Sequence, residues 1–151
     1  MNRSIKFALV LAASAMFAGS AAAERGTAAE AQELLGKAVA HYQAAGRAQA
    51  IADFNNPSGQ FVEDDLYVFC IGPDNTMVAH GANAALIGTN TDGLKDADGK
   101  PIGQQIREIG RQQGSGTLDY KFMNPTTRQA EPKSTFIQRV GEDVCAVGYY
   151  K

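Results

Sequence analysis

Apolar residues recur at helical spacing soon after the start of the chain. Glu33 and Lys37 fall on the polar side, and the apolar face comprises Ala31, Leu34, Leu35, Ala38, Val39 and Tyr42. Thr27 and Glu30 have the spacing of a capping box, in which both side chains bind free backbone amides at a helix start. The pattern predicts a long helix that ends or bends at Gly46.

The following segments change from a helical to an extended pattern. A shorter helix is expected over Arg47–Phe54, and Asn55–Gly59 is rich in residues that interrupt regular structure. Aromatic and β-branched residues over Leu66–Ile71 predict a strand. The turn residues Gly72–Asn75 follow, and Thr76–His80 returns as the second strand of a hairpin.

The second half of the chain combines one helix with three strands. Pro101 is typical of a helix start, and isoleucines at helical spacing continue the pattern to about Gly114, namely Ile102, Ile106 and Ile109. Strands are then expected over about Gly116–Met123, Lys133–Val140 and Asp143–Tyr150. A long helix followed by runs of strands favours one α+β domain with an antiparallel sheet.

The start of the chain has the pattern of a cleavable secretory signal. Arg3 and Lys6 give a positive start, and the apolar run Phe7–Phe17 is too short for a membrane span of about 20 residues. Three alanines then provide the small residues that signal peptidase reads. We therefore predict a signal peptide over residues 1–23 and a single periplasmic or secreted domain over residues 24–151. A retained membrane anchor is the alternative.

The charge balance bears on the choice of partner. Cleavage lowers the 14 basic residues to 12 against 16 acidic ones, which gives the mature chain a net charge of −4. This balance gives no reason to expect nucleic acid or an anionic membrane as partner. No segment after the signal is long and apolar enough to span a membrane.

Two cysteines, Cys70 and Cys145, remain in the mature chain, and both lie inside strand-like runs. In an exported protein such a pair can form a disulfide. The alternative is a pair of small buried side chains. The sequence leaves both interpretations open.

No catalytic or metal-binding motif is present. The chain has no Gly-x-Ser-x-Gly, Cys-x-x-Cys or His-Glu-x-x-His pattern and no glycine-rich phosphate loop. Asp96–Gly99 begins like a calcium loop but lacks the later oxygen ligands, which predicts a plain turn. His41 lies within the amphipathic helix, where a partly exposed structural role is expected. An enzyme would need an acid–base pair that the sequence does not show.

Several segments, in their order along the chain, resemble one known family. Gly116–Pro125, Glu131–Ile137 and Val144–Tyr150 follow a hairpin that ends at His80 and the segment Leu86–Asn90. Together they are similar to the single Cache domain, an extracytoplasmic relative of the PAS sensor fold. The resemblance implies a PAS-like, five-stranded antiparallel sheet in the order 2-1-5-4-3 with a long N-terminal helix. It also implies binding of a small ligand, with short-chain carboxylates favoured, and no chemistry.

The resemblance also implies which residues bind the ligand. His80 ends a strand, where it can donate to a carboxylate and can be charged near neutral pH. Lys133, just after a proline at the entrance of its strand, supplies a point charge for a small anion. Tyr120 offers a hydroxyl group, and Phe122 and Tyr67 provide aromatic walls. The alternative is a local hydrogen bond for His80, solvation for Lys133 and core packing for the aromatic residues.

We therefore expect an exported domain that binds a small organic carboxylate, with no catalytic residue, cofactor or metal. A sensory receptor needs a membrane span and an output domain, and this chain shows neither. It is expected either to signal through an unidentified partner protein or to act as a soluble binding protein. The alternatives are a structural or interaction module with a degenerate pocket and, less favoured, a small exported hydrolase.

Overall fold

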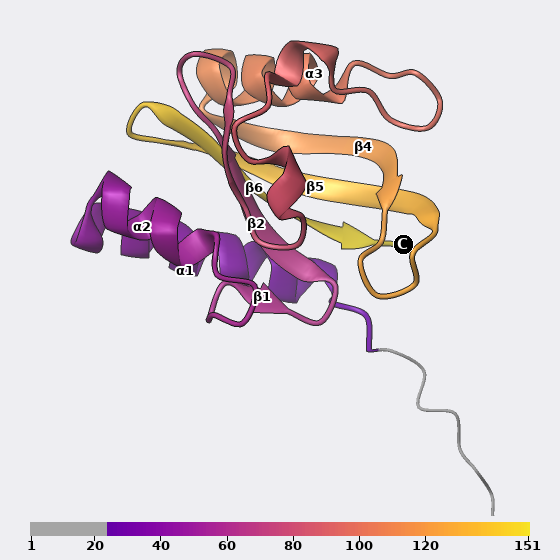
Figure 1. Ribbon diagram of the computed structural model, residues 1–151, viewed down its shortest axis with the longest axis horizontal. Helices are drawn as coiled ribbons and strands as arrows, with labels where there is room; N and C mark the ends of the chain where they lie inside the picture. The colour runs from indigo at the N-terminus through magenta and orange to yellow at the C-terminus, as the bar shows by residue number, and fades with distance from the viewer. Residues whose placement is uncertain (1–23) are drawn as a thin grey trace, which may run out of the picture.

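The computed structural model describes residues 24–151, and the expected signal peptide, residues 1–23, lies outside this range. The described chain forms a sheet with helices on both faces (Figure 1). The helices are α1 (Ala28–Ala45), α2 (Arg47–Phe54) and α3 (Ile102–Glu108), which continues as a π-helical turn over Ile109–Gln113. The strands are β1 (Val62–Glu63), β2 (Leu66–Ile71), β3 (Met77–His80), β4 (Ser115–Met123), β5 (Ala130–Val140) and β6 (Asp143–Tyr150).

The strand pairs are antiparallel and follow the spatial order β3, β2, β6, β5, β4. Numbered along the chain without β1, this order is 2-1-5-4-3, so the topology implied by the family resemblance is confirmed. The two-residue strand β1 also pairs with β2 and was not predicted. Because β2 pairs with β6, the first hairpin and the end of the chain meet at the centre of the sheet.

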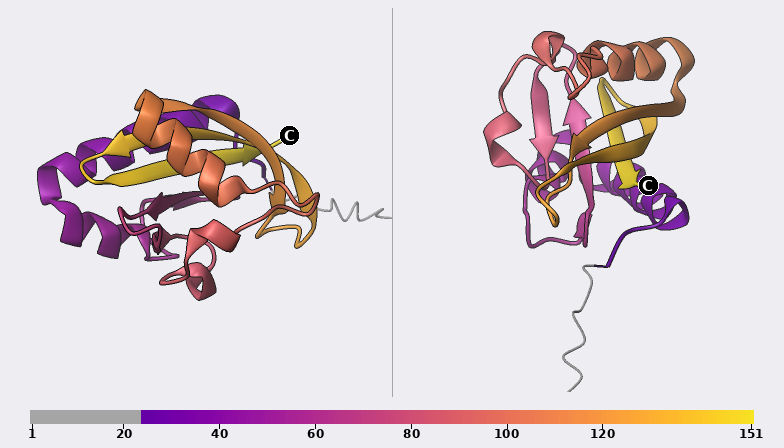
Figure 2. Two further views of the ribbon diagram at one scale, coloured as in Figure 1. Left: turned by 90° about the horizontal axis from the view of Figure 1, so that it is seen from above. Right: turned by 90° about the vertical axis from the view of Figure 1, so that its right-hand side faces the viewer.

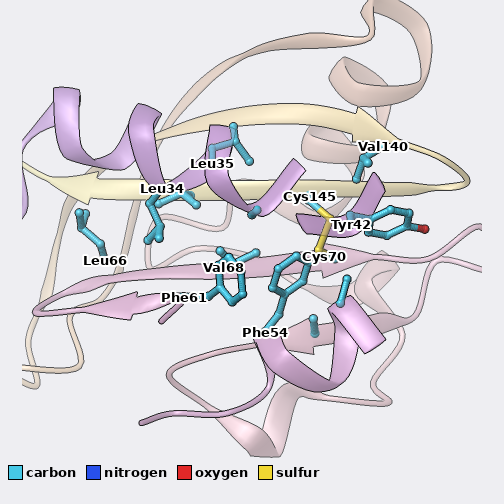
Figure 3. Packing of buried hydrophobic residues seen from close by; sticks show 14 of the residues in the cluster. Leu34, Leu35, Tyr42, Phe54, Phe61, Leu66, Val68, Cys70, Val140 and Cys145 are labelled. Carbon is cyan, nitrogen blue, oxygen red and sulfur yellow. A yellow bond between two sulfur atoms is a disulfide. The ribbon is translucent and has the colours of Figure 1, made fainter. Parts of the chain in front are cut away.

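Helices α1 and α2 pack on one face of the sheet. The capping box of Thr27 and Glu30 is present, and Gly46 ends α1 at a φ of 84°, a region that favours glycine. The predicted bounds of both helices are therefore confirmed. Figure 3 shows the buried side chains between these helices and the strands, which include Leu34, Leu35, Tyr42, Phe54, Phe61, Leu66, Val68 and Val140.

Helix α3 and the segment before it lie on the opposite face of the sheet (Figure 2). The connection from β3 to α3 contains two short 3-10 turns, Ala84–Leu86 and Thr91–Gly93. Ile102 and Ile106 of α3 are buried in a second apolar cluster with Tyr67, Phe69, Ile71, Met77, Tyr120, Ile137, Val144 and Ala146. The fold therefore has two cores, one on each face, and predicted ligand-binding residues lie in the second.

Strand β5 begins earlier than the sequence predicts. Its first residue is Ala130 instead of Lys133, and Lys133 lies opposite Tyr120 of β4 and Tyr150 of β6. Pro132 is tolerated inside the strand because its carbonyl still accepts a hydrogen bond, from the Lys151 amide at 2.9 Å. The prediction that Lys133 lies at a strand entrance is therefore wrong, and its side chain is held by strands on both sides.

A disulfide joins Cys70 and Cys145 in the middle of the sheet (Figure 3). The two residues are directly opposite each other on β2 and β6, and their Cα atoms are 4.0 Å apart. Both are buried in the core beneath α1 and α2. The bond spans a sequence separation of 75 residues and links the first hairpin covalently to the last strand.

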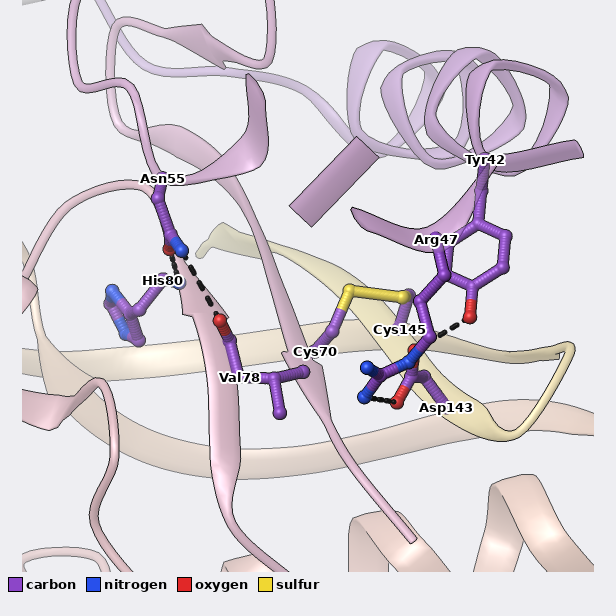
Figure 4. The surroundings of a disulfide bond; sticks show 8 residues. All are labelled: Tyr42, Arg47, Asn55, Cys70, Val78, His80, Asp143 and Cys145. Carbon is purple, nitrogen blue, oxygen red and sulfur yellow. Dashed lines mark hydrogen bonds and ion pairs between the residues drawn. A yellow bond between two sulfur atoms is a disulfide. The ribbon is translucent and has the colours of Figure 1, made fainter. Parts of the chain in front are cut away.

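A buried charged cluster lies near the disulfide, as Figure 4 shows. The Asp143 carboxylate is fully buried and accepts hydrogen bonds from Tyr42 Oη at 2.6 Å and Arg47 Nε at 2.8 Å. Burial and this hydrogen bond to Asp143 raise the pKa of Tyr42 above its ordinary value, so its hydroxyl stays a donor. The cluster ties the junction of α1 and α2 to the start of β6.

Candidate functional site

A small cavity lies between α3 and the sheet, within the second core. Its volume is about 10 Å³, which is the space that one water molecule needs. The wall is mainly apolar or aromatic and consists of Tyr67, Phe69, Met77, His80, Leu94, Ile102, Ile106, Tyr120 and Phe122. The residues with polar groups all come from strands β2, β3 and β4, which hold them rigidly.

Lys133 is buried beside this cavity, with an exposed fraction of 1%. Its Nζ donates a hydrogen bond to Tyr67 Oη at 2.8 Å. Aromatic rings surround the amine at distances that allow a cation to be attracted to their faces. The distances from Nζ to the ring centroids are 4.2 Å for Tyr67, 4.9 Å for Tyr150, 5.6 Å for Phe122 and 5.8 Å for Phe69. Most of these rings also line the cavity, so Nζ lies at its edge.

The Lys133 ammonium is poorly compensated by the surrounding protein. It has three N–H donors, and the hydrogen bond to Tyr67 uses one of them. Burial lowers the pKa of Lys133 to about 7, and the negative charge of buried Asp65 opposes this shift in part. Within residues 24–151, no carboxylate forms an ion pair with Lys133. A bound anion would supply the missing charge and acceptors.

His80 presents a neutral ring to the same cavity. Its Nδ1 accepts hydrogen bonds from the backbone amides of Ala82 at 3.3 Å and Asn83 at 2.9 Å, so the ring proton belongs on Nε2. Burial, together with the positive charge of Lys133, lowers the pKa of His80 to about 3. The prediction that His80 can be charged near neutral pH is therefore wrong. His80 instead offers one neutral Nε2–H donor.

Tyr120 faces the cavity from β4, directly opposite Lys133. Its Oη accepts a hydrogen bond from Thr135 Oγ1 at 2.9 Å, which leaves its own hydroxyl proton free to donate. Burial raises the pKa of Tyr120 well above its ordinary value, so the hydroxyl remains protonated. Phe122 packs edge-on against the Tyr120 ring, with 6.0 Å between their centroids.

The structure thus brings the predicted ligand-binding residues together at one cavity. His80, Tyr120, Phe122 and Tyr67 line it, and Lys133 lies at its edge. The Tyr67 ring lies between Lys133 and His80: its centroid is 4.8 Å from that of the tilted His80 ring, and its hydroxyl accepts the hydrogen bond from Lys133. Their role in ligand binding stays a prediction.

Other lining residues were not predicted as part of a site. Ile102 and Ile106 were identified only as part of a helix face, and no feature of the sequence marked Met77 or Leu94 as part of a binding site. Tyr150 was missed because it lies at the end of the chain, far in sequence from Lys133, although it is directly opposite Lys133 in the sheet. Only strand pairing reveals this proximity.

The remaining polar candidates have local structural roles. Asp96 Oδ1 accepts hydrogen bonds from the amides of Asp98 and Lys100, which closes the expected turn. His41 Nε2 lies 2.7 Å from Asp53 Oδ2, between α1 and α2. In the part of the chain that the structure describes, no cluster of histidine, cysteine, aspartate or glutamate has the geometry of a metal site.

The sequence pattern of the family described as Single Cache domain 2 matches residues 2–143. This match spans nearly the whole chain, and the chain therefore belongs to the single Cache domain family. Cache domains are extracytoplasmic sensor domains. None of the curated proteins matches the chain in sequence.

Solved Cache sensor domains have the same fold. A methyl-accepting chemotaxis protein from Vibrio parahaemolyticus is 20% identical, with a TM-score of 0.68 over 81% of this chain and 86% of its own. A periplasmic sensor domain of a chemotaxis protein is 23% identical, with a TM-score of 0.63 over 80% and 87%. A third structure is a Cache chemosensory domain that is described as showing the structural basis for carboxylic acid recognition. It is 19% identical, with a TM-score of 0.61 over 80% of this chain and 85% of its own. Within residues 24–151, no helix has the length and apolar character that crossing a membrane requires.

Proposed function

We propose that this protein is an exported, non-catalytic Cache domain that binds a small organic carboxylate. The observation that carries the proposal is the buried amine of Lys133, which has one hydrogen bond and a surrounding cage of aromatic rings. A buried charge is costly unless a counter-charge and hydrogen-bond acceptors accompany it. A carboxylate ligand would provide both. The carboxylic acid recognition reported for one structural neighbour supports this ligand class.

The donors around the cavity match the acceptors of a carboxylate. Lys133 Nζ can give two charge-assisted hydrogen bonds, and His80 Nε2–H and the Tyr120 hydroxyl can each give a neutral one. Ile102 and Ile106 of α3 would pack against a short apolar tail. All of these donors are held by strands, which reduces the entropy lost on binding. Recognition needs no proton transfer or nucleophile, in keeping with a binding role.

The cavity must widen to accept such a ligand, because about 10 Å³ is room for one water molecule and any carboxylate is larger. Leu94 and Phe122 are the half-buried members of its wall, and their side chains are the ones we expect to move.

The small volume of the cavity favours the rival function, a module for protein interaction whose pocket is filled by its own side chains. Binding measurements distinguish the two functions.

The proposal is tested with the purified exported protein and a panel of acetate, propionate, lactate and pyruvate, each paired with its neutral amide. A binder gains thermal stability as ligand is added, and the gain follows the ratio of ligand concentration to Kd. We expect at least one carboxylate to raise Tm and to bind in calorimetry, the amides not to bind, and the ligand to be recovered unchanged by mass spectrometry. No binding by any carboxylate, or equal binding of an acid and its amide, would refute carboxylate recognition.

Binding of the carboxylate is expected to weaken as pH rises from 6 to 9. Burial lowers the pKa of Lys133 to about 7, so the cationic form that attracts the ligand is lost across this range. Affinity falls by up to about tenfold per pH unit above the pKa of the free site. His80, with its pKa lowered to about 3, stays neutral throughout and does not contribute. Calorimetry at four pH values measures the slope, and a constant Kd would contradict a role for the Lys133 charge.

The free protein is expected to respond to pH in the opposite direction. The pKa of Lys133 in the folded state lies below the ordinary lysine value of about 10.4, so the unfolded state binds more protons between these values. The contribution of Lys133 to stability therefore rises with pH in that window, while the affinity for carboxylate falls.

A further inference from the structure

The side chain of Lys133 crosses a neighbouring strand to reach its hydrogen-bond partner. Lys133 belongs to β5 and Tyr67 to β2, and β6 lies between these two strands in the sheet. The amine must therefore pass over the backbone of β6 to contact Tyr67. A side chain at the position of β6 over which the amine passes would obstruct this path.

Gly148 of β6 lies where this crossing occurs. A Cβ atom added to Gly148 would overlap Cε of Lys133 and Oγ1 of Thr135 and would lie 3.2 Å from Cδ of Lys133. Gly148 is not among the glycines with positive φ, so its backbone conformation does not require glycine. The lack of a side chain at this position is explained by space, which Lys133 and Thr135 occupy together.

We propose that Gly148 is a positioning residue of the ligand site, because its missing side chain opens the channel through which Lys133 reaches Tyr67 and the cavity. This inference rests on the proposed function, since it concerns where the charge that meets the carboxylate is placed. With a methyl group at position 148, the Lys133 ammonium is displaced from its aromatic cage. Its alternative position is a second cleft, which Lys133 lines together with Tyr120, Lys100 and Asp119.

The first test measures carboxylate affinity in a double-mutant cycle of Gly148→Ala and Lys133→Ala. We expect Gly148→Ala to weaken binding about as much as Lys133→Ala, by roughly 10- to 150-fold, the range for losing a charge-assisted hydrogen bond. The double variant should bind no more weakly than Lys133→Ala, because one interaction is removed in both cases. Parent-like affinity of a folded Gly148→Ala variant, or losses that add in the double variant, would overturn the inference.

A second readout does not depend on any ligand. Lysine labelled with ¹³C at Cε allows the titration of Lys133 to be followed by nuclear magnetic resonance in the parent and in Gly148→Ala. The parent amine is expected to titrate near 7, and the displaced amine of the variant nearer the ordinary lysine value of about 10.4. If no carboxylate binds the parent, the proposed function fails and this titration alone decides the role of Gly148. Identical titrations in the two proteins would overturn that role.

Controls separate positioning from general damage to the fold. Gly36 on the exposed side of α1 has no atom within 4 Å of an added Cβ, so Gly36→Ala should leave affinity and titration unchanged. If Gly148→Ala does not fold, the double variant with Lys133→Ala should regain stability, because the overlap with Lys133 is removed. The overlap of the new methyl group with Thr135 is present in both the single and the double variant, so it does not affect the difference in stability between them. Equal instability of the single and double variants would count against the inference.

Discussion

Removing the Cys70–Cys145 disulfide is expected to lower the free energy of unfolding by about 4 kcal/mol. The bond closes a separation of 75 residues, and a cross-link over such a loop restricts the unfolded chain strongly. For a domain of this size the loss corresponds to a fall in Tm of roughly 10–20 °C. Thermal unfolding of Cys70→Ala/Cys145→Ala, followed by circular dichroism, measures the effect.

Reduction of the parent protein provides the matched comparison. Both cysteines are buried, so the disulfide becomes accessible to reductant only when the protein opens. Unfolding in excess dithiothreitol should give the same low Tm as the double variant, and dithiothreitol should not affect the variant. A Tm within a few degrees of the oxidised parent in both experiments would show that the disulfide contributes little to stability.

Replacing Lys133 by methionine is expected to abolish most of the carboxylate affinity. The change removes the one cationic side chain that residues 24–151 place at the cavity edge and keeps a side chain of similar length, so the aromatic cage stays filled. The loss of a charge-assisted hydrogen bond corresponds to about 1.5–3 kcal/mol, or roughly a 10- to 150-fold weaker Kd. The remaining affinity should no longer depend on pH between 6 and 9, which calorimetry can measure.

The same substitution should not destabilise the free protein. An ammonium group that is buried without a carboxylate partner costs desolvation energy, and an apolar side chain in its place does not. We therefore expect the Tm of Lys133→Met to equal or exceed that of the free parent at pH 6. Lys37→Met on the exposed face of α1 is the control and should change neither Tm nor affinity appreciably. Parent-like carboxylate binding by folded Lys133→Met would rule out charge recognition at this site.

The local elements were predictable because their signals lie in neighbouring residues. The capping box of Thr27 and Glu30, the glycine at position 46 and the spacing of apolar residues define α1 without reference to the rest of the fold. The hairpin of β2 and β3 is marked by its turn residues in the same way. The predicted strand β5 begins three residues too late, because a proline is rarely found inside a strand. Pro132 lies inside this strand because its carbonyl group still accepts a hydrogen bond from the neighbouring chain segment.

The candidate site was only partly predictable. The family resemblance selected His80, Tyr120 and Lys133, and all three lie at one cavity. It did not reveal that burial and the positive charge of Lys133 lower the pKa of His80, or that Lys133 is fully buried. Hydrogen bonds and desolvation depend on which groups surround a side chain, and the sequence around these residues does not contain that information.

Pattern and local chemistry therefore determined the helices, the strands and the type of residues available for an anion. Only the tertiary structure decided which of these residues meet. The register of β2 against β6 places Cys70 opposite Cys145, and a shift of one residue would direct their side chains to different faces. The same sheet order brings Lys133 across Gly148 to Tyr67, because residues far apart in sequence become neighbours through strand pairing.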